Sequence, residues 1–314
     1  MRRALLALIL IAATGCGSGN ARVAVTGPPT TAGPTSTTAT GAATTTTALS
    51  TTTAPSTTTT VPVVAAWSVA VVGDFGDGGE AEGQVAAAIE AWVGVHPDTR
   101  ALITTGDNFY TSDVAAAWEA PYGWVEAAGL AVWAVPGNHD IESAGQWLAS
   151  VRAFGAFPHW GTREAGGVTF VMLDSNQAES AEQREWLGQT VADLAGRPWI
   201  AVFHHPWHSC GTHGSNAGVA ENWGDLLDGA VLVLNGHDHD YQRFETERGW
   251  SVVTGGGGKA LYAVADCPSG TEPPVVAAEV FHFLGITGDA SGFVVEAITA
   301  DGTVIDSFRV GIGS

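Results

Sequence analysis

Five short apolar segments of this 314-residue chain each end in a turn that delivers a polar side chain. Apolar runs rich in β-branched residues and bounded by glycine predict buried strands. One aspartate after a strand is more often a turn former, and one buried histidine is more often a hydrogen-bonded core residue. Five cases in series are hard to explain by independent roles, so we expect these side chains to gather at one edge of a sheet. In chain order they are Asp74 after 67–73, Asp107 after 101–105, Asn138 and His139 after 130–135, His204 and His205 after 199–203, and His237 and His239 after 230–234.

Other patterns in the chain predict the elements that lie between these segments. Apolar residues at helical spacing predict helices at 79–94, 114–127 and 180–194, the last with Ser180 as N-cap and Gln183 at the capping-box position. Further strands are expected at 168–174, 249–253, 280–287, 292–299 and 303–310, with the last four forming an antiparallel meander. Together these elements indicate an α/β fold in which helices cover a mixed sheet system.

The N-terminus has the pattern of an export signal. Residues 1–15 place two arginines before an apolar run that is too short for an ordinary membrane span, so we predict a secretory signal peptide. The small residues Ala13, Thr14 and Gly15 directly before Cys16 resemble a bacterial lipobox, in which the cysteine carries a diacylglycerol after cleavage. We therefore expect an exported lipoprotein, anchored to the outer face of the bacterial cytoplasmic membrane or cell envelope. Ordinary signal cleavage that leaves a free cysteine is the alternative.

Residues 16–65 differ in composition from the rest of the chain, because they are rich in Thr, Ser, Ala and Pro and carry almost no charge. Such a segment buries too little apolar surface to offset the entropy lost on ordering, so we predict a disordered tether. Residues 66–314 remain as one domain, which is long enough for a full hydrophobic core.

The charge of the chain excludes one class of partner. The formal net charge is −20, every Asp and Glu lies within 66–314, and Lys259 is the only lysine. Nucleic-acid binding normally needs a basic face, so we expect no nucleic-acid partner. A small phosphorylated substrate is still compatible with this acidity, because bound cations can reverse the local potential.

Cys210 and Cys267 are the only cysteines beyond Cys16. In an exported chain two cysteines can close one disulfide, and two free thiols are the alternative.

The residue types at the five turns fit a pair of metal ions. Hard cations prefer carboxylate oxygen, whereas borderline divalent ions also accept imidazole nitrogen and amide oxygen. Two metals held about 3.5–4 Å apart need a shared anionic bridge, which an aspartate supplies. Such a pair generates hydroxide near neutral pH and holds a phosphoryl group during in-line attack.

The five turns also resemble the motifs of a known family, the calcineurin-like metallophosphoesterases. The motifs in family order are GDFG at 73–76, GDNFY at 106–110, GNHD at 137–140, FHHP at 203–206 and GHDH at 236–239. Within that superfamily the chain is most similar to the purple acid phosphatases of the small, single-domain, tartrate-resistant type. The resemblance implies a four-layer αββα sandwich of two mixed β-sheets flanked by helices, extending over about 66–314.

The first and second motifs distinguish the purple acid phosphatases from other members. Most metallophosphoesterases have Asp-x-His in the first motif, whereas this chain has Gly76 two residues after Asp74. Purple acid phosphatases replace the missing imidazole by a tyrosine, here Tyr110, three residues after Asp107. A phenolate is a hard oxygen donor that favours Fe³⁺, and its charge-transfer band would colour the protein purple.

The resemblance implies two ligand sets that share Asp107. Fe³⁺ would be held by Asp74, Asp107, Tyr110 and His239, and a divalent Zn, Mn or Fe by Asp107, Asn138, His204 and His237. The fourth motif departs from the family because Phe203 occupies a position that is usually glycine, which puts the local loop shape in question. In the family the ligand lies two residues before the proline of this motif, here Pro206. The resemblance therefore favours His204 over His205 as the ligand.

The resemblance further implies catalytic roles for His139 and His213, which would contact phosphate and protonate the leaving group while a metal-bound hydroxide attacks a phosphate monoester. A solvated loop histidine is the alternative for His213. An imidazole suits acid catalysis because its ordinary pKa is about 6.5. Asn108 and Asp140 are expected to support the ligands from behind.

Other functions remain open at this point. A phosphodiesterase or nucleotidase could use the same centre, and a non-catalytic, lipid-tethered binding protein is a further alternative. All seven ligand positions hold competent residues, which speaks against the binding protein. The glycine-rich segment 254–260 lacks the pattern of a phosphate-binding P-loop, so we expect a tight turn near the metals. We expect a monomer.

Overall fold

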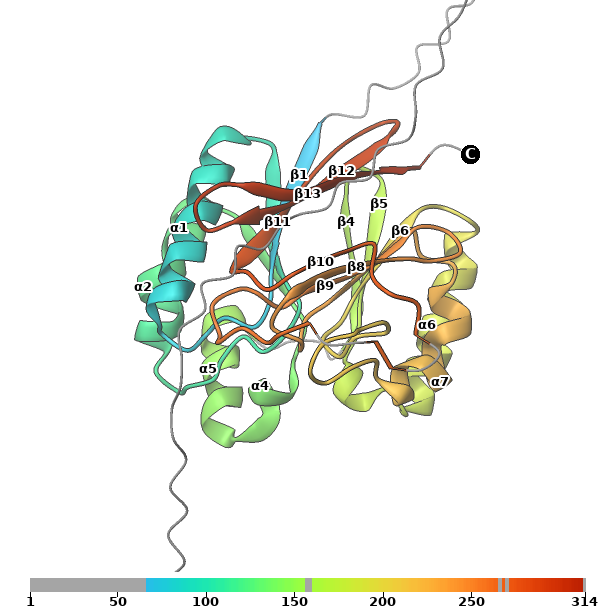
Figure 1. Ribbon diagram of the computed structural model, residues 1–314, viewed down its shortest axis with the longest axis horizontal. Helices are drawn as coiled ribbons and strands as arrows, with labels where there is room; N and C mark the ends of the chain where they lie inside the picture. Colours follow the sequence, from blue (N-terminus) through green and yellow to red (C-terminus); the bar gives the residue numbers. More distant parts are fainter. Residues whose placement is uncertain (1–65, 156–159, 265–266, 269–270, 313–314) are drawn as a thin grey trace, which may run out of the picture. The chain divides into compact units, whose positions relative to one another are not determined.

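The computed structural model describes residues 66–155, 160–264, 267–268 and 271–312. The predicted signal peptide at 1–15, Cys16 and the predicted tether at 16–65 lie outside these residues. Within the described residues, a pair of β-sheets packs face to face, and helices cover the outer face of each sheet (Figure 1). The predicted α/β fold class, a four-layer αββα sandwich, is confirmed.

The first sheet has six strands in the order β13–β12–β11–β1–β2–β3. Its parallel half contains three neighbouring strands, and their carboxyl ends therefore lie at one edge: β1 (Trp67–Val72), β2 (Thr99–Thr104) and β3 (Ala131–Ala134). The other half is an antiparallel meander of β11 (His282–Asp289), β12 (Gly292–Thr299) and β13 (Val304–Gly311), joined to β1 through β11.

The second sheet has seven strands in the order β10–β8–β9–β7–β6–β5–β4. Its centre is parallel: β5 (Val168–Met172), β6 (Trp199–Val202), β7 (Leu232–Asn235) and β9 (Trp250–Thr254). Antiparallel strands close both edges: β4 (Gly161–Ala165) on one side, and β8 (Tyr241–Glu245) with β10 (Val276–Ala278) on the other.

Strand alternation explains how the layers form. In β1, Val69 and Val71 point into the core between the sheets, while Ala70 and Val72 point to the outer face of the first sheet. That outer face packs on α1 (Glu80–Val95) and on the short α2 (Ala120–Tyr122) and α3 (Trp124–Ala127). The outer face of the second sheet packs on α6 (Ala181–Leu194) and α7 (Ala217–Leu227). Among the described residues no helix has both the length and the apolar character needed to cross a membrane.

The helix predicted at 114–127 is broken into three pieces. A π-helical turn at Ala115–Glu119 is followed by α2 and α3. Pro121 has no backbone N–H to donate and Gly123 weakens the helix, so a single regular helix cannot run through both. The predicted helical segment at 114–127 is therefore confirmed, but it is irregular and divided into short pieces.

The predicted four-strand meander was wrong in one member. The segment predicted at 249–253 forms β9, which lies in the second sheet, parallel to β7 and antiparallel to β8. The other three strands form the meander as expected: β12 has the predicted bounds, and the bounds of β11 and β13 are shifted by two residues and one residue. Alternation along β9 does not distinguish the sheets, because both faces of each sheet are covered.

Several elements were not predicted: α4 (Asn138–Glu142), α5 (Ala144–Phe154), η2 (Ser175–Gln177), α7, β4, β8 and β10. The helix α4 starts inside the GNHD motif, where Asp140 accepts from the backbone N–H of Gly137 (2.8 Å). In the sequence these residues indicated only chemical roles: Asn138 as a ligand, His139 as a catalytic group and Asp140 as a supporting residue. Short strands with polar residues, such as β4 and β8, carry little periodic signal of their own.

At the start of α6 the predicted N-cap is confirmed, but the predicted role of Gln183 is not. Ser180 is the N-cap and accepts a hydrogen bond from the backbone N–H of Gln183 (3.3 Å). The Gln183 side chain is buried and does not close a capping box. It bonds instead to the backbone of Asp174 and Gln177, and so secures the turn that follows β5.

Candidate metal centre

Seven side chains converge where strands of both sheets end. They follow the carboxyl ends of β1, β2 and β3 in the first sheet and of β6 and β7 in the second. Parallel neighbours end at a common edge, so the strand order brings the turns of each sheet together, and the packing of the two sheets brings the two sets of turns into contact. The residues are Asp74, Asp107, Tyr110, Asn138, His204, His237 and His239.

The first group of donor atoms surrounds the Tyr110 hydroxyl. Its oxygen lies 3.3 Å from Asp74 Oδ1, 3.1 Å from Asp107 Oδ2 and 3.1 Å from His239 Nε2. His239 Nε2 is also 3.5 Å from Asp74 Oδ1. The structure thus brings together the four residues that the resemblance assigned to Fe³⁺.

The second group of donor atoms surrounds His204 Nε2. This nitrogen lies 3.1 Å from Asn138 Oδ1, 3.3 Å from Asp107 Oδ1 and 3.2 Å from His237 Nδ1. Asp107 therefore faces the first group with Oδ2 and the second group with Oδ1. A carboxylate with one oxygen in each group has the arrangement that a bridging ligand requires.

Backbone carbonyls orient two of the imidazole rings. His204 Nδ1 lies 3.0 Å from the carbonyl oxygen of Thr105, and His239 Nδ1 lies 2.7 Å from that of Ala260. A carbonyl accepts only, so each Nδ1 carries a proton, and each Nε2 faces the site, where a bound metal would take its lone pair. This tautomer is the one in which a histidine can bind a metal through Nε2.

The local backbone is strained where the donors leave the strands. Asp74, Asp107 and His237 have positive φ angles of 58°, 49° and 72°, a region that residues other than glycine rarely occupy. Such conformations persist only where surrounding contacts enforce them, and they cluster at functional sites. Here both carboxylate oxygens of Asp74 accept from the backbone N–H of His237 at 3.0 Å.

Two glycines let these turns approach one another. A side chain at Gly137 would overlap the Asp107 carboxylate, and one at Gly236 would overlap Asp74. Glycine is required at both positions because the backbone itself forms the wall behind the donors.

Asn108 and Asp140 lie behind the turn that carries Asp107. The buried Asp140 carboxylate accepts from the backbone N–H groups of Asn108, Phe109 and Gly137 and from the hydroxyl of Ser150. It also accepts from the Asn108 side chain at 2.7 Å. These bonds tie the turn after β2 to the turn after β3, which carry two donors of the second group.

Burial and charge act together on the pKa values of the site. Burial alone would raise the pKa of Asp107, but the charge and hydrogen bond of His204 lower it below its usual range. Burial, with the neighbouring Asp74 and Asp107 charges next, raises the pKa of Tyr110 well above its ordinary value. Burial and the nearby His204 lower the pKa of His237 to about 2, which leaves that imidazole neutral. A cation placed among these groups would offset the repulsion between the carboxylates and a phenolate.

The two predicted catalytic histidines lie at the rim. The His213 ring is 4.3 Å from the ring of His237, and its side chain is exposed. The His139 ring is 4.6 Å from that of Tyr110, and its Nδ1 lies 2.6 Å from Glu142 Oε2. His213 therefore borders the second group of donors through His237, and His139 borders the first group through Tyr110.

His205 also lies in the cluster. Donor atoms of His204, His205 and His237 lie within 4.8 Å of one another, and the same holds for Asp74, Asp107 and His204. His205 Nδ1 is 2.9 Å from the hydroxyl of Ser175, which also accepts from the His205 backbone N–H. This contact gives His205 a role in the wall of the site.

Sequence reasoning assigned no role to three further neighbours of the site. Tyr262 stacks on the His239 ring at 4.0 Å, Lys259 Nζ lies 4.6 Å from the centre of the Tyr110 ring, and Glu142 pairs with His139. Lys259 was conspicuous as the only lysine, but nothing in the sequence indicated its place. The glycine-rich segment at 254–260 does form a turn beside the site, where Lys259 N donates to the carbonyl of Asp74 (3.0 Å).

The donor set fits two metal ions of different character. The first group contains two carboxylates and a phenol, which are hard oxygen donors, and one imidazole. The second group contains two imidazoles, an amide oxygen and the shared carboxylate, which suits a borderline divalent ion. The convergence of potential ligand atoms on two neighbouring points is the observation that supports this fit.

Comparison with known proteins identifies the fold and the family. A family profile described as calcineurin-like phosphoesterase matches residues 68–241. No curated protein sequence showed significant similarity. Among solved structures, the chain is similar to a purple acid phosphatase from yellow lupin seeds, with 18% identity, a TM-score of 0.67, and coverage of 79% of this chain and 54% of that one.

A second similar structure is the GAP50 anchor of the inner membrane complex of Plasmodium. It has 16% identity and a TM-score of 0.66, and the match covers 79% of this chain and 90% of that one. At such identities the likeness establishes the fold alone.

Proposed function

The chain belongs to the calcineurin-like phosphoesterase family, and from this premise we propose that it is a metal-dependent acid phosphatase that hydrolyses phosphate monoesters. Its substrate would be a small phosphorylated molecule. The proposal rests on the residues around Tyr110 and on the basic side chains at the rim of the site.

The position of Tyr110 is the observation that supports an iron-containing phosphatase. Its hydroxyl lies among Asp74, Asp107 and His239, where a ligand from the first motif would otherwise be needed. A side chain at Gly76 would overlap the backbone of Asn108 and Phe109, so an imidazole at that position has no space. The phenol thus supplies the fourth donor, and a phenolate favours Fe³⁺.

We propose the following ligands for the two metals. Fe³⁺ would be held by Asp74, Asp107, Tyr110 and His239, and a divalent Zn, Mn or Fe by Asp107, Asn138, His204 and His237. When bound, the two cations would acidify a water molecule and neutralise the charge that develops on the phosphoryl group.

The side chains at the rim would act on the substrate. A phosphate monoester is a dianion, and His139, His205 and His213 surround the donor groups with N–H groups that can bind its oxygens. His213 is exposed and next to His237, so it is the better placed of the two predicted acids to protonate a leaving alkoxide. Such proton transfer typically contributes about 10²–10⁴-fold to the rate.

Metal analysis combined with turnover of p-nitrophenyl phosphate tests the proposal. We expect the purified protein to contain iron and a second transition metal, to be coloured, and to hydrolyse the monoester faster than bis(p-nitrophenyl) phosphate. Asp107→Asn, which removes one anionic bridging oxygen, is the matched inactive control. If the protein binds no transition metal and releases no phosphate, the proposed function is wrong. A preference for the diester would indicate a phosphodiesterase that uses the same centre.

Export and lipid attachment at Cys16 are proposed on the sequence pattern alone, because that region lies outside the described residues. Radiolabelled palmitate should label the precursor in bacterial cells and should fail to label the Cys16→Ala variant. Absence of label on the unaltered chain would contradict the lipoprotein assignment.

A further inference from the structure

Residues 209–213, which lead to His213, have no helix or strand of their own, yet side chains from 238–242 hold them in place. Asp238 lies between the candidate ligands His237 and His239 and is buried. Its Oδ1 accepts from the backbone N–H of His213 (2.8 Å), and its Oδ2 accepts from the hydroxyl of Ser209. Both carboxylate oxygens are thus engaged by the segment that carries the proposed acid.

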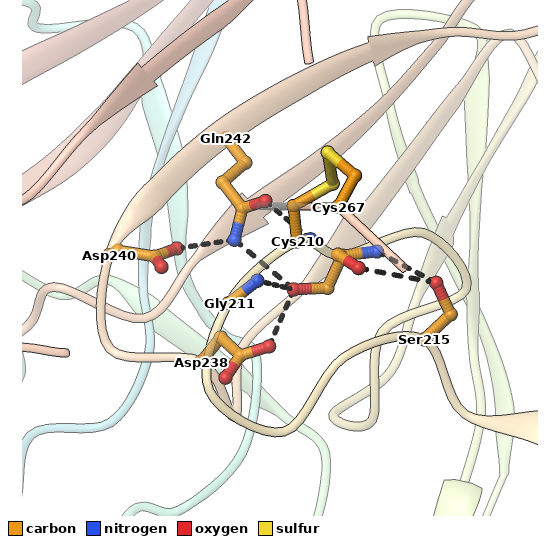
Figure 2. The surroundings of a disulfide bond; sticks show 8 residues. Cys210, Gly211, Ser215, Asp238, Asp240, Gln242 and Cys267 are labelled. Atoms are coloured by element: carbon orange, nitrogen blue, oxygen red, sulfur yellow. Dashed lines mark hydrogen bonds between the residues drawn. A yellow bond between two sulfur atoms is a disulfide. The ribbon is translucent and has the colours of Figure 1, made fainter. Parts of the chain in front are cut away.

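The same network fixes the rest of the segment (Figure 2). The Ser209 hydroxyl accepts from the backbone N–H of Gly211 (2.9 Å) and from Gln242 Nε2 (3.1 Å). Gln242 Oε1 accepts from the backbone N–H of Cys210 (2.7 Å), and its Nε2 also donates to Asp240 (2.8 Å). The backbone N–H groups of residues 210, 211 and 213 are therefore all taken up by this network.

Steric and covalent contacts add to these hydrogen bonds. A side chain at Gly211 would overlap the Asp238 carboxylate, so the segment and the carboxylate are in direct contact. The Cys210–Cys267 disulfide links the segment to the loop after β9, which carries Tyr262. Tyr262 in turn lies 5.3 Å from the His213 ring.

We propose that Asp238 is a positioning residue: it holds the backbone of residues 209–213 so that the His213 imidazole stays against His237, where it can protonate the leaving group of an unactivated alkyl phosphate. This inference rests on the proposed function. Asp238 acts through His213 and has no contact with the substrate.

The chemistry makes the role of Asp238 separable from that of the metals. In hydrolysis a water oxygen forms a bond to phosphorus and loses a proton to solvent, and the bond between phosphorus and the ester oxygen breaks. The ester oxygen receives a proton from His213, which regains a proton from solvent. An alkoxide is a poor leaving group and needs this proton, whereas p-nitrophenolate leaves readily without it. Misplacing His213 should therefore slow alkyl esters selectively.

The test compares glycerol 2-phosphate with p-nitrophenyl phosphate in the metal-containing full-length enzyme. Asp238→Ala should lower kcat for glycerol 2-phosphate by about 100-fold while p-nitrophenyl phosphate falls by less than about 3-fold, with unchanged metal content. Asp238→Asn, which keeps an acceptor for the His213 N–H, should restore part of the loss. If Asp238→Ala does not fold, Ser209→Ala is the alternative variant, because it removes only the hydroxyl that donates to Asp238. It should change the ratio of kcat for the two substrates in the same direction.

Two controls separate positioning from general destabilisation. Asp306→Ala removes another partly buried carboxylate, which bonds Tyr241 and Arg243, and should leave the ratio of the two substrates unchanged. His213→Ala combined with Asp238→Ala should be no slower than His213→Ala alone, because both changes remove one function.

A measurement independent of activity is hydrogen exchange at the His213 backbone N–H, which should be protected in the unaltered protein and lose protection in Asp238→Ala. The inference is overturned if Asp238→Ala slows both esters equally, or if the His213 N–H exchanges freely in the unaltered chain. If the unaltered enzyme cleaves neither ester, the proposed function fails and this inference fails with it.

Discussion

Tyr110 provides the most direct test of the metal assignment. In the iron-loaded protein Tyr110→Phe should abolish the visible absorption band, because the phenolate that donates charge to Fe³⁺ is lost. Absorption spectroscopy on equal amounts of bound iron makes the measurement. Tyr262→Phe is the matched control, since Tyr262 stacks on His239 and should leave the band in place. An unchanged spectrum in Tyr110→Phe would remove the phenol from the metal site.

Asp140 is expected to be a stability determinant rather than a catalytic group. Asp140→Asn would place an amide donor against the N–H groups of Asn108, Phe109 and Gly137, leaving at least one buried donor unsatisfied. Such a group costs about 1–3 kcal/mol, so we expect the free energy of unfolding to fall by at least about 1–3 kcal/mol in urea titration. The exposed Asp113→Asn should change it by less than about 0.5 kcal/mol. Equal effects of the two changes would contradict this account.

That these side chains gather at one place was predictable from the sequence, whereas their supporting contacts were not. Asp74, Asp107 and His239 each follow a strand with a strong apolar signal, and their spacing in motifs carries the chemistry. The contacts of Asp238 and Tyr262 depend on loops more than 20 residues apart in sequence, which no local pattern encodes. In the sequence Asp238 indicates only the spacing between His237 and His239, and its hydrogen-bond partners are visible only in the folded structure.

At the scale of elements, the start of α1 contains a pH-sensitive group. Glu82 is fully buried, and its Oε2 accepts from the backbone N–H groups of Asp77 and Gly78 at 3.0 and 2.6 Å. Burial, partly offset by these bonds, raises the pKa of Glu82 to about 7 from its ordinary 4.5. The folded state thus holds this proton more tightly than the unfolded state, so the stabilisation is present below pH 4.5 and is lost as pH rises through 7.

The expected result is a pH-dependent difference between the unaltered chain and Glu82→Gln. The unfolding free energy of the unaltered chain should fall relative to the variant between pH 5 and 8, by on the order of 3 kcal/mol. Urea unfolding at both pH values makes the comparison. Glu80→Gln, on the exposed first turn of the same helix, should show no such trend. A pH-independent difference for Glu82→Gln would contradict a raised pKa.

The Cys210–Cys267 disulfide connects two loops that flank the site. The cysteines are 57 residues apart, and closing a loop of that length stabilises by about 4 kcal/mol in the chain-entropy treatment. Replacing both cysteines by serine should lower the urea midpoint, and reduction of the unaltered protein should lower it equally. If reduced and oxidised proteins unfolded at the same midpoint, the bond would not contribute to stability.

The elements themselves were predictable where periodicity was strong and failed where local chemistry intervened. The central strands β1, β2, β6 and β7 match the expected apolar runs to within two residues at each end. The break near Pro121 had a visible cause in the sequence, but apolar spacing outweighed it in the prediction. Which sheet β9 joins depends on long-range pairing with β7, and a short apolar run does not specify its partner.

At the scale of the whole molecule, the sheet arrangement explains why the site is distributed over so much of the chain. The donors extend from Asp74 to His239, and they follow the carboxyl ends of parallel strands in both sheets. Each donor alone contributes little, and the pair of ligand groups exists only when both sheets are formed and packed. Metal binding should therefore be coupled to folding of the entire domain.

This coupling predicts that metal removal lowers thermal stability. Ions that bind the native state only stabilise it by about 2.7 kcal/mol when their free concentration is 100 times the dissociation constant. They would also offset the repulsion among Asp74, Asp107 and Tyr110 in a chain whose net charge is −20. Calorimetry should show a higher Tm with metal than after chelation. Asp107→Asn, which removes one of the two bridging oxygens, should abolish most of this difference in Tm. If the variant showed the same difference in Tm as the unaltered chain, the stabilising ions would bind elsewhere.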